Sequence, residues 1–401
     1  MRLVQFGAGN IGRSFVGQIF SMAHWEVIFI DIDGKIIDEL NRKGQYIVEI
    51  KDREPKTIVV KHVRGIPALD LEQVSDEVAG ADLVSTAVGK KALPHIMKPI
   101  ALGLIKRRKS PPGKPLDVII CENMKNAAAF FKSSLKKELP DDFPLEDCAG
   151  FIETSIGKMV PIMSEKEKMV DPLLVQAEAY NTLIVDKVGF KGPIPEVPEL
   201  DPKDNIKAYV DRKLFIHNLG HAVLSYTSFV FKRGYTYIWE AAFDKVLAEV
   251  TKQAMWESGR AVIAEYPADF NDQNINDHIN DLLMRFGNRA LGDSIYRAGR
   301  DLYRKLWTDD RLIGAVKLCL KHGIIPEKIS LGVASAMFFR AKDENGQMYE
   351  NDRLFHEKEI SKGINHVLKN ICNLKNAEVC SLIERYYVML NRGERDIGVF
   401  F

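Results

Sequence analysis

The chain has 401 residues, of which 46% are hydrophobic and 28% are charged. This length exceeds what one hydrophobic core usually organises, so we expect two domains of ordinary globular composition. The formal net charge of +1 at pH 7 gives no large uniform field. It therefore argues against nucleic acid or an anionic membrane as partner and favours a small-molecule ligand.

Short apolar runs alternate with amphipathic segments in the first third of the chain. The runs that we expect to form strands are residues 3–6, 27–30, 82–87 and 118–121. Strands separated in this way by helical stretches are typical of a parallel sheet with helices on both faces. Two further runs, residues 173–177 and 183–185, are expected to be strands as well.

A G-x-G-x-x-G turn follows the first strand and consists of Gly7, Ala8, Gly9, Asn10, Ile11 and Gly12. In a dinucleotide-binding fold the first glycine permits the tight turn, the second lets a pyrophosphate approach the backbone, and the third packs helix on strand. The phosphates then meet N–H groups at the helix N-terminus. Glycines that served only as turn residues would not need this joint spacing, so we predict a dinucleotide site.

The second expected strand ends in Asp31, about twenty residues after the glycine turn. A carboxylate at this position accepts hydrogen bonds from the ribose hydroxyls and repels a 2′-phosphate. No arginine follows it directly, because the next residues are Ile32, Asp33 and Gly34. We therefore expect NAD(H) and not NADP(H).

A proline-rich stretch, residues 193–202, interrupts the strand pattern, and from residue 206 apolar residues recur every three or four positions. This spacing predicts helices. We therefore predict an α/β protein. Residues 1–195 are expected to form an NAD-binding, Rossmann-type doubly wound sheet, and residues 196–401 a mostly α-helical substrate domain.

Three polar residues, Lys213, Asn218 and His221, lie near the start of the second domain, where we expect the substrate cleft. On an ideal helix Lys213 and His221 lie about 80° apart, so one broad face can carry all three. A metal-free hydride-transfer enzyme needs such a proton donor and acceptor, and donors for the developing alkoxide. Taken singly, each residue also fits an ordinary role, as a solvated lysine, a surface amide or a core histidine.

His217 and His221 are four residues apart, the spacing of two metal ligands on one face of a helix. The glutamate of an HExxH motif is absent, and no nearby carboxylate is an obvious third ligand. We predict no metal.

A second polar cluster consists of Arg297, Arg300, Arg304 and Lys305. Arginine forks suit a phosphate or another anion, so these residues are candidates for binding the distal end of a substrate. The alternative is a basic, solvated helix face.

Long segments resemble the polyol-specific long-chain dehydrogenases, the mannitol dehydrogenase family, over nearly the whole chain. They are FGAGNIGR at 6–13, DLVSTAVG at 82–89, CENM at 121–124, IVDK at 184–187, RKLFIHNLGHA at 212–222 and GRDLYRKL at 299–306. Within the family, the similarity is greatest to members that act on mannitol 1-phosphate.

The resemblance implies a role for individual residues. Lys213 would be the general base in alcohol oxidation and the general acid in ketone reduction, with a pKa lowered by burial. Asn218 and Asn123 would donate hydrogen bonds to the alkoxide, and His221 would orient the substrate or the lysine. Family members use positions matching Arg297 and Lys305 to bind polyols. Thr86, Ala87 and Val88 would contact the cofactor.

The implied reaction is the NAD-dependent, metal-independent interconversion of mannitol 1-phosphate and fructose 6-phosphate. One departure concerns Gly157 and Lys158, which stand where the family usually has Asp-Arg. That aspartate approaches substrate hydroxyls in relatives, so the substrate stays open. The alternatives are an unphosphorylated polyol or a hexuronate such as fructuronate or tagaturonate. A non-catalytic NAD(H)-sensing protein is a further alternative, but it would need only the glycine turn.

The five cysteines show neither a CxxC pair nor zinc-like spacing, so we expect free thiols in a reducing cytoplasm. The first residues already have the pattern of a strand, which predicts no export signal. No run approaches the roughly 20 apolar residues of a membrane span. We expect a cytoplasmic monomer.

Overall fold

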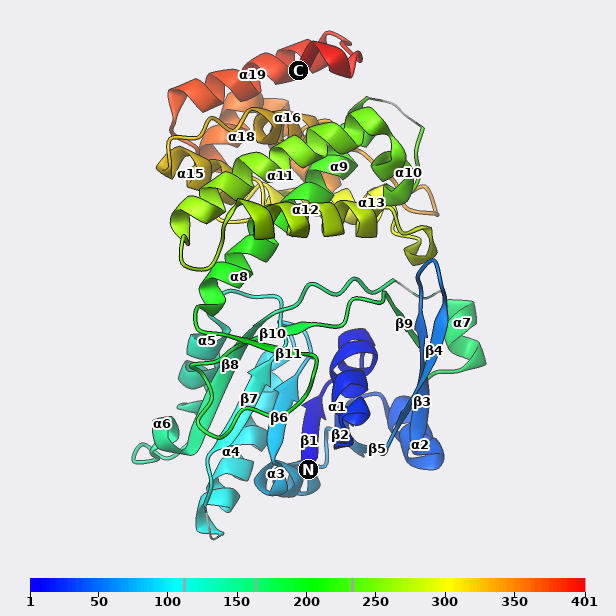
Figure 1. The fold of residues 1–401 in the computed structure, drawn as a ribbon, viewed down its shortest axis with the longest axis vertical. Helices are drawn as coiled ribbons and strands as arrows, with labels where there is room; N and C mark the ends of the chain where they lie inside the picture. Colours follow the sequence, from blue (N-terminus) through cyan, green and yellow to red (C-terminus); the bar gives the residue numbers. More distant parts are fainter. Residues whose placement is uncertain (111–112, 162, 164, 232–233, 401) are drawn as a thin grey trace. The chain divides into compact units, whose positions relative to one another are not determined.

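The structure is a computed structural model that describes residues 1–110, 113–161, 163, 165–231 and 234–400. The chain forms two compact units, Met1–Val210 and Asp211–Phe401, which occupy the blue-to-green and green-to-red parts of Figure 1.

Eight strands form the main sheet in the described part of the first unit, in the order β11-β10-β8-β7-β6-β1-β2-β5. Neighbouring strands are parallel except β8 and β10. The order reverses at β1, so the carboxyl ends of β1 and β6 lie side by side, where such sheets bind ligands. The strands are β1 (Arg2–Phe6), β2 (Glu26–Asp31), β5 (Val63–Pro67), β6 (Leu83–Thr86), β7 (Leu116–Ile120), β8 (Ala149–Ser155), β10 (Leu183–Asp186) and β11 (Leu200–Lys203).

The two faces of this sheet have separate cores because successive strand residues point to opposite sides. On one face Leu3, Val27 and Phe29 pack against the helix that follows the glycine turn, and on the other Val4, Ile28 and Val118 pack against three helices. The first helix is a π-helical turn, Gly12–Gly17, continued by α1 (Gln18–Met22). The helices of the other face are α3 (Leu71–Gly80), α4 (Leu93–Lys109) and α5 (Ala127–Leu135). The predicted doubly wound α/β domain is confirmed.

A second, three-stranded sheet was not predicted. It has the order β4-β3-β9 and consists of β3 (Gln45–Ile50), β4 (Lys56–Lys61) and β9 (Val175–Ala177). The segment 173–177, predicted as a strand, thus pairs with β3 and lies outside the main sheet. Tyr46, Val48 and Ile50 alternate with less buried residues along β3, which is the signal that a half-buried strand leaves in a sequence. Three short helices complete the unit, α2 (Gly34–Lys43), α6 (Leu145–Cys148) and α7 (Glu165–Val170).

The division between the units falls at Val210, fifteen residues after the predicted end of the first domain at residue 195. The reason is β11, which pairs in parallel with β10 and aligns Leu200 with Leu183. Pro202 is part of this strand, as an edge strand allows because one side of its backbone has no partner strand. The proline-rich stretch that suggested a linker therefore carries the last strand of the sheet.

The described part of the second unit consists of helices, as predicted. At its centre α9 (Asn218–Val230) is buried on most sides and packs against α11, α13 and α16. The helix α8 (Ile206–Arg212) spans the division between the units. The other helices are a π-helical turn Lys213–His217, α10 (Ile238–Phe243), α11 (Lys245–Glu265), α12 (Asp272–Phe286), α13 (Ile295–Gly299), α14 (Leu302–Lys305), α15 (Ile313–Lys321), α16 (Glu327–Ala336), α17 (Glu350–Lys358), α18 (Ile364–Asn370) and α19 (Ala377–Asn391). Short 3₁₀ turns lie at Arg289–Leu291, Ile360–Lys362 and Ile397–Phe400.

Among the described residues, no helix has both the length and the apolar character needed to cross a membrane.

Candidate active site

The glycine turn follows β1 and lies beside the carboxyl ends of β2 and β6. Gly7 has a φ of 92°, and a Cβ atom there would lie 2.4 Å from the carbonyl oxygen of Ala87. At Gly12 a Cβ atom would lie 2.0 Å from the carbonyl oxygen of Gly7, whereas at Gly9 it would meet nothing within 4 Å. Two of the glycines are thus required by close packing of the turn itself. The third leaves open space over the backbone.

Asp31, at the end of β2, faces this turn. Its Oδ2 accepts a hydrogen bond from the backbone N–H of Ala8 at 2.6 Å, and its Oδ1 accepts one from Asp33 at 3.0 Å. The side chain that the sequence assigned to the ribose therefore also fixes the turn. The carbonyl of the same residue, Ala8, accepts a hydrogen bond from the buried guanidinium of Arg13 at 2.6 Å.

The segment after β6 is held by a carboxylate that the sequence analysis did not single out. Glu122 is buried, and its two oxygens accept from the N–H groups of Val88 at 2.8 Å and Gly89 at 3.0 Å. Burial raises the pKa of Glu122, against the effect of these two N–H groups. Of the predicted cofactor residues here, Thr86 is fully buried in β6, whereas Ala87 and Val88 are partly exposed.

Asn123 follows Glu122 and is exposed at the carboxyl end of β7. The predicted cofactor residues and Asn123 thus all belong to strand ends of the first unit. Open space over Gly9, a helix beginning at Asn10 and a carboxylate at Asp31 are the features that a dinucleotide needs. The residues present fit such a cofactor.

Lys213 begins the π-helical turn between α8 and α9. The backbone N–H of Asn218 donates to the carbonyl of Lys213, five residues earlier, so the ideal-helix angle between Lys213 and His221 does not apply. Burial of the ammonium group, followed by the charges of Arg311 and Arg304, lowers the pKa of Lys213 to about 8, although Asp310 opposes the shift. π-Helical turns inside α-helices are frequent at functional sites.

His221 lies one turn into α9 and is partly exposed. Its Nε2 lies 2.7 Å from Oδ2 of Asp293, and its ring is 5.4 Å from that of Phe286. The same carboxylate accepts from Nε of Arg297 at 2.7 Å. Asp293 therefore joins a predicted catalytic residue to a predicted substrate residue, and the sequence analysis missed it.

His217 is buried, and burial together with neighbouring positive charge lowers its pKa well below the usual value. In the part of the chain that the structure describes, no three or more histidine, cysteine or acidic side chains are grouped so as to hold a metal ion.

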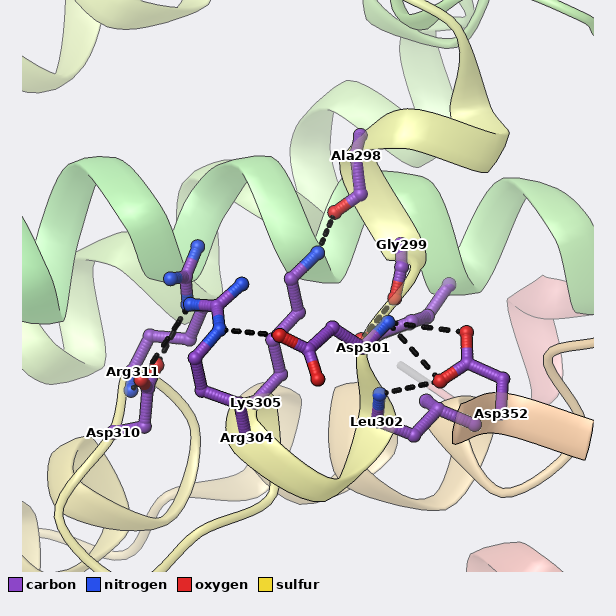
Figure 2. A network of polar contacts seen from close by, with 10 residues as sticks. Ala298, Gly299, Asp301, Leu302, Arg304, Lys305, Asp310, Arg311 and Asp352 are labelled. Carbon is purple, nitrogen blue, oxygen red and sulfur yellow. Dashed lines mark hydrogen bonds and ion pairs between the residues drawn. The ribbon is translucent and has the colours of Figure 1, made fainter. Parts of the chain in front are cut away.

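Lys305, Arg304 and Arg311 form a charged network around α14 (Figure 2). The ammonium of the buried Lys305 donates to the carbonyl of Ala298, and Nε of Arg304 donates to Asp301 at 2.6 Å. Arg304 and Arg311 both pair with Asp310, at 3.7 Å and 2.8 Å. Because Arg304, Arg311 and Asp310 also influence Lys213, this network belongs to the surroundings of the lysine.

The turn that carries this network is strained. Asp301 has a φ of 77°, a left-handed conformation that costs a non-glycine residue energy, although aspartate adopts it more readily than most. The buried carboxylate of Asp352 on α17 accepts from the N–H groups of Asp301 at 3.0 Å and Leu302 at 2.7 Å, and Figure 2 shows it holding this turn.

Arg300 is separate from these ion pairs. Its guanidinium lies 5.7 Å from the ring centre of Tyr296 and 5.6 Å from that of Tyr349. The four cations predicted as one cluster therefore have three environments, with Arg297 at Asp293, Arg300 near two aromatic rings, and Arg304 with Lys305 around α14.

At the position of the family's usual Asp-Arg pair, Gly157 lies beside the ring of Tyr180, which a Cβ atom would meet at 3.5 Å. Lys158 is buried, and its Nζ donates to Oδ1 of Asn181 at 2.7 Å and lies 5.1 Å from the ring centre of Phe15. Lys158 thus packs against the helix that follows the glycine turn.

Both units match known protein families. Residues 1–199 match the mannitol dehydrogenase Rossmann domain, and residues 205–384 match the mannitol dehydrogenase C-terminal domain. A mannitol-1-phosphate 5-dehydrogenase from Halalkalibacterium halodurans is 33% identical over 351 residues, which cover 87% of this chain and 91% of that protein.

Two solved structures share the fold. One is the mannitol 2-dehydrogenase of Pseudomonas fluorescens in a ternary complex with NAD and D-mannitol, with a TM-score of 0.70 at 17% identity over 100% of this chain and 93% of that one. The other is a substrate-free D-sorbitol dehydrogenase, with a TM-score of 0.79 at 18% identity over 99% and 94% of the two chains.

Proposed function

The chain belongs to the mannitol dehydrogenase family, and on this premise we propose that it interconverts mannitol 1-phosphate and fructose 6-phosphate with NAD as its cofactor. The substrate is supported by the relative named mannitol-1-phosphate 5-dehydrogenase, at 33% identity. The observation that carries the proposed chemistry is the pKa of Lys213, which is lowered to about 8. An acid–base group works best when its pKa lies near the operating pH.

NAD, when bound, accepts the hydride in alcohol oxidation and returns it, as NADH, in ketone reduction. Lys213 takes the hydroxyl proton during oxidation and delivers a proton to the ketone oxygen during reduction. Asn218 and Asn123 donate hydrogen bonds to this oxygen as negative charge develops on it. His221 orients the substrate.

Several residues would hold the cofactor. The backbone from Gly7 to Gly12 receives the pyrophosphate, and Asp31 accepts from the adenosine ribose and disfavours a 2′-phosphate. The strand-end residues Ala87 and Val88 would line the other half of the cofactor, with Glu122 holding the N–H of Val88 and Thr86 supporting them from β6.

Arg297, Arg300, Arg304 and Lys305 would bind the part of the substrate away from the reacting carbon, with a phosphate as the anion. The exposed Arg304 suits this role because an arginine fork binds phosphate through two parallel hydrogen bonds. It is at present paired with Asp301 and Asp310, so a phosphate would compete with these carboxylates.

The catalytic proposal is tested with the variant Lys213→Ala. We expect the rate of NADH oxidation with fructose 6-phosphate to fall by about 100- to 10,000-fold, the usual contribution of an acid–base group, while the NADH affinity measured by fluorescence stays the same. Lys245→Ala is the matched control, because this lysine is exposed on α11. Wild-type protein that binds NADH without turning over any ketose would instead be an NAD(H) sensor.

A substrate panel tests the phosphate. The kcat/KM values are compared for fructose 6-phosphate, fructose, fructuronate and tagaturonate, with NADH and then with NADPH. We expect fructose 6-phosphate with NADH to be preferred. Equal values for fructose and fructose 6-phosphate would reject the phosphate assignment, and a preference for a keto-uronate would reassign the cations to a carboxylate.

A further inference from the structure

Asp293 lies between the 3₁₀ turn Arg289–Leu291 and α13, and its carboxylate contacts two side chains. Oδ2 lies 2.7 Å from Nε2 of His221, and Oδ1 accepts from Nε of Arg297 at 2.7 Å. The side chain of Asp293 is 8% exposed. Its two oxygens thus face one histidine and one arginine in a largely dehydrated place.

The charge state of Asp293 fixes the direction of both hydrogen bonds. Burial by itself raises the pKa of this carboxyl, but His221 and Arg297 outweigh it and hold the pKa well below its ordinary value. The group is therefore a carboxylate at neutral pH and can only accept. Nε2 of His221 must then carry a proton, which leaves Nδ1 as the ring nitrogen that can meet a ligand.

Two contacts of this segment do not involve the carboxylate of Asp293. Ser294 caps α13, because its side chain accepts from the N–H of Arg297 at 3.2 Å. The contact with α10 involves only the backbone of Asp293, because its carbonyl oxygen accepts a hydrogen bond from the N–H of Ile238 at 2.8 Å. Both contacts would survive a change of the Asp293 side chain.

We propose that Asp293 is a positioning residue that sets the tautomer of His221 and the orientation of Arg297. The consequence for activity depends on the proposed function, in which both of these residues meet the substrate. A carboxylate that holds a histidine in one tautomer has the role of the aspartate in a Ser-His-Asp triad.

The variant Asp293→Asn gives a sharp test because it should reverse the tautomer. Arg297 is always a donor, so the amide oxygen will face Arg297 and the amide NH₂ will face Nε2 of His221. Nε2 must then accept, and the neutral ring must carry its proton on Nδ1. We expect ¹⁵N NMR of histidine-labelled protein to show an Nε2–H tautomer in the wild type and an Nδ1–H tautomer in Asp293→Asn. The His221 signals are assigned by their loss in His221→Gln.

The change of tautomer should also lower the catalytic rate. We expect kcat for fructose 6-phosphate reduction to fall by about 10- to 100-fold in Asp293→Asn, the loss that follows when the hydrogen-bond partner of a metal-ligating histidine is removed, with the melting temperature and NADH affinity nearly unchanged. Asp281→Asn is the matched control, because Asp281 also pairs with an arginine four residues later, Arg285, at 3.2 Å. This control should leave kcat and the His221 tautomer as they are.

Several outcomes would overturn the proposal. One is an Nδ1–H tautomer in the wild type, a measurement that needs no variant to fold. The others are an unchanged tautomer in Asp293→Asn, or a reversed tautomer with an unchanged kcat. If the wild type reduces no ketose at all, the proposed function fails, whereas the reversal of the tautomer still supports the role of Asp293 toward His221.

Discussion

The ammonium group of Lys213 loses hydration on folding, and Arg311 and Arg304 repel its charge. Both effects favour the neutral amine, so the pKa falls from its model-compound value of 10.5 to about 8. A neutral fraction of this amine is then present near pH 7, which is what abstraction of an alcohol proton requires. The same environment makes the protonated form a better acid for ketone reduction.

The pH dependence of the two directions should therefore differ in sign. Oxidation of mannitol 1-phosphate needs neutral Lys213, so its kcat/KM should rise with pH and level off above an apparent pKa of about 8. Reduction of fructose 6-phosphate needs the ammonium form, so its kcat/KM should fall as pH rises through the same value. Steady-state rates in both directions measure this.

Replacement of Arg311 by Gln sharpens the measurement. It removes a charge that lowers the pKa of Lys213, so both profiles should move to higher pH, whereas Arg311→Lys keeps the charge and should move them less. An apparent pKa near the ordinary 10.5 in the wild type would contradict the assignment of Lys213 as the acid–base group.

At the scale of elements, both predicted sites contain an irregular helix. The helix after the glycine turn includes the π-helical turn Gly12–Gly17, and the segment of Lys213 is the π-helical turn Lys213–His217. A sequence pattern based on 3.6 residues per turn predicts the helices but not these turns. The relative directions of Lys213 and His221 therefore required the structure.

The glycine turn allows stability and cofactor binding to be separated. In Gly12→Ala the new Cβ would lie 2.0 Å from the carbonyl of Gly7, so the turn must shift. We expect a loss of about 1–3 kcal/mol of stability together with weaker NADH binding. In Gly9→Ala the Cβ points into open space. The melting temperature should stay the same, and only NADH binding should weaken, because a pyrophosphate needs that space.

Thermal melts and NADH titrations of the two variants provide the measurement. Wild-type NADH affinity in Gly9→Ala would show that no phosphate approaches this backbone.

At the scale of the whole molecule, the first unit has its own hydrophobic cores. The two clusters on the faces of the main sheet consist of residues of the first unit alone; one ends at Phe151 and the other at Leu200, which lies in β11. A unit with complete cores of this kind can be expected to fold alone.

A fragment of residues 1–210 should therefore unfold cooperatively and bind NADH. A fragment that ends at residue 195 lacks β11 and exposes the edge of β10, whose residues Leu183 and Val185 are fully buried in the intact chain. We expect a lower melting temperature for the shorter fragment, measured by circular dichroism. Equal melting temperatures of the two fragments would mean that β11 contributes little to stability and that the division between the domains lies near residue 195.

The sequence by itself determined the features that depend on short spacings. The glycine turn with Asp31, the strands around it, the helical second unit and the family resemblance all follow from residues close together in the chain, because local backbone geometry imposes such spacings. The fold class and the family were predictable from these signals. The alternation along β3 is also a short-range signal, since buried and less buried residues follow each other there.

Only the tertiary structure decided which polar groups meet. His221 and Asp293 are 72 positions apart, and Glu122 and Val88 are 34 apart. The charges that adjust the pKa of Lys213 come from residues 304–311. A hydrogen bond between such residues leaves no periodic pattern, because each is fixed by packing of whole elements and not by its neighbours in sequence. The sequence thus indicated Lys213 as the proposed acid–base residue, and the fold supplied the groups that adjust its pKa and hold His221.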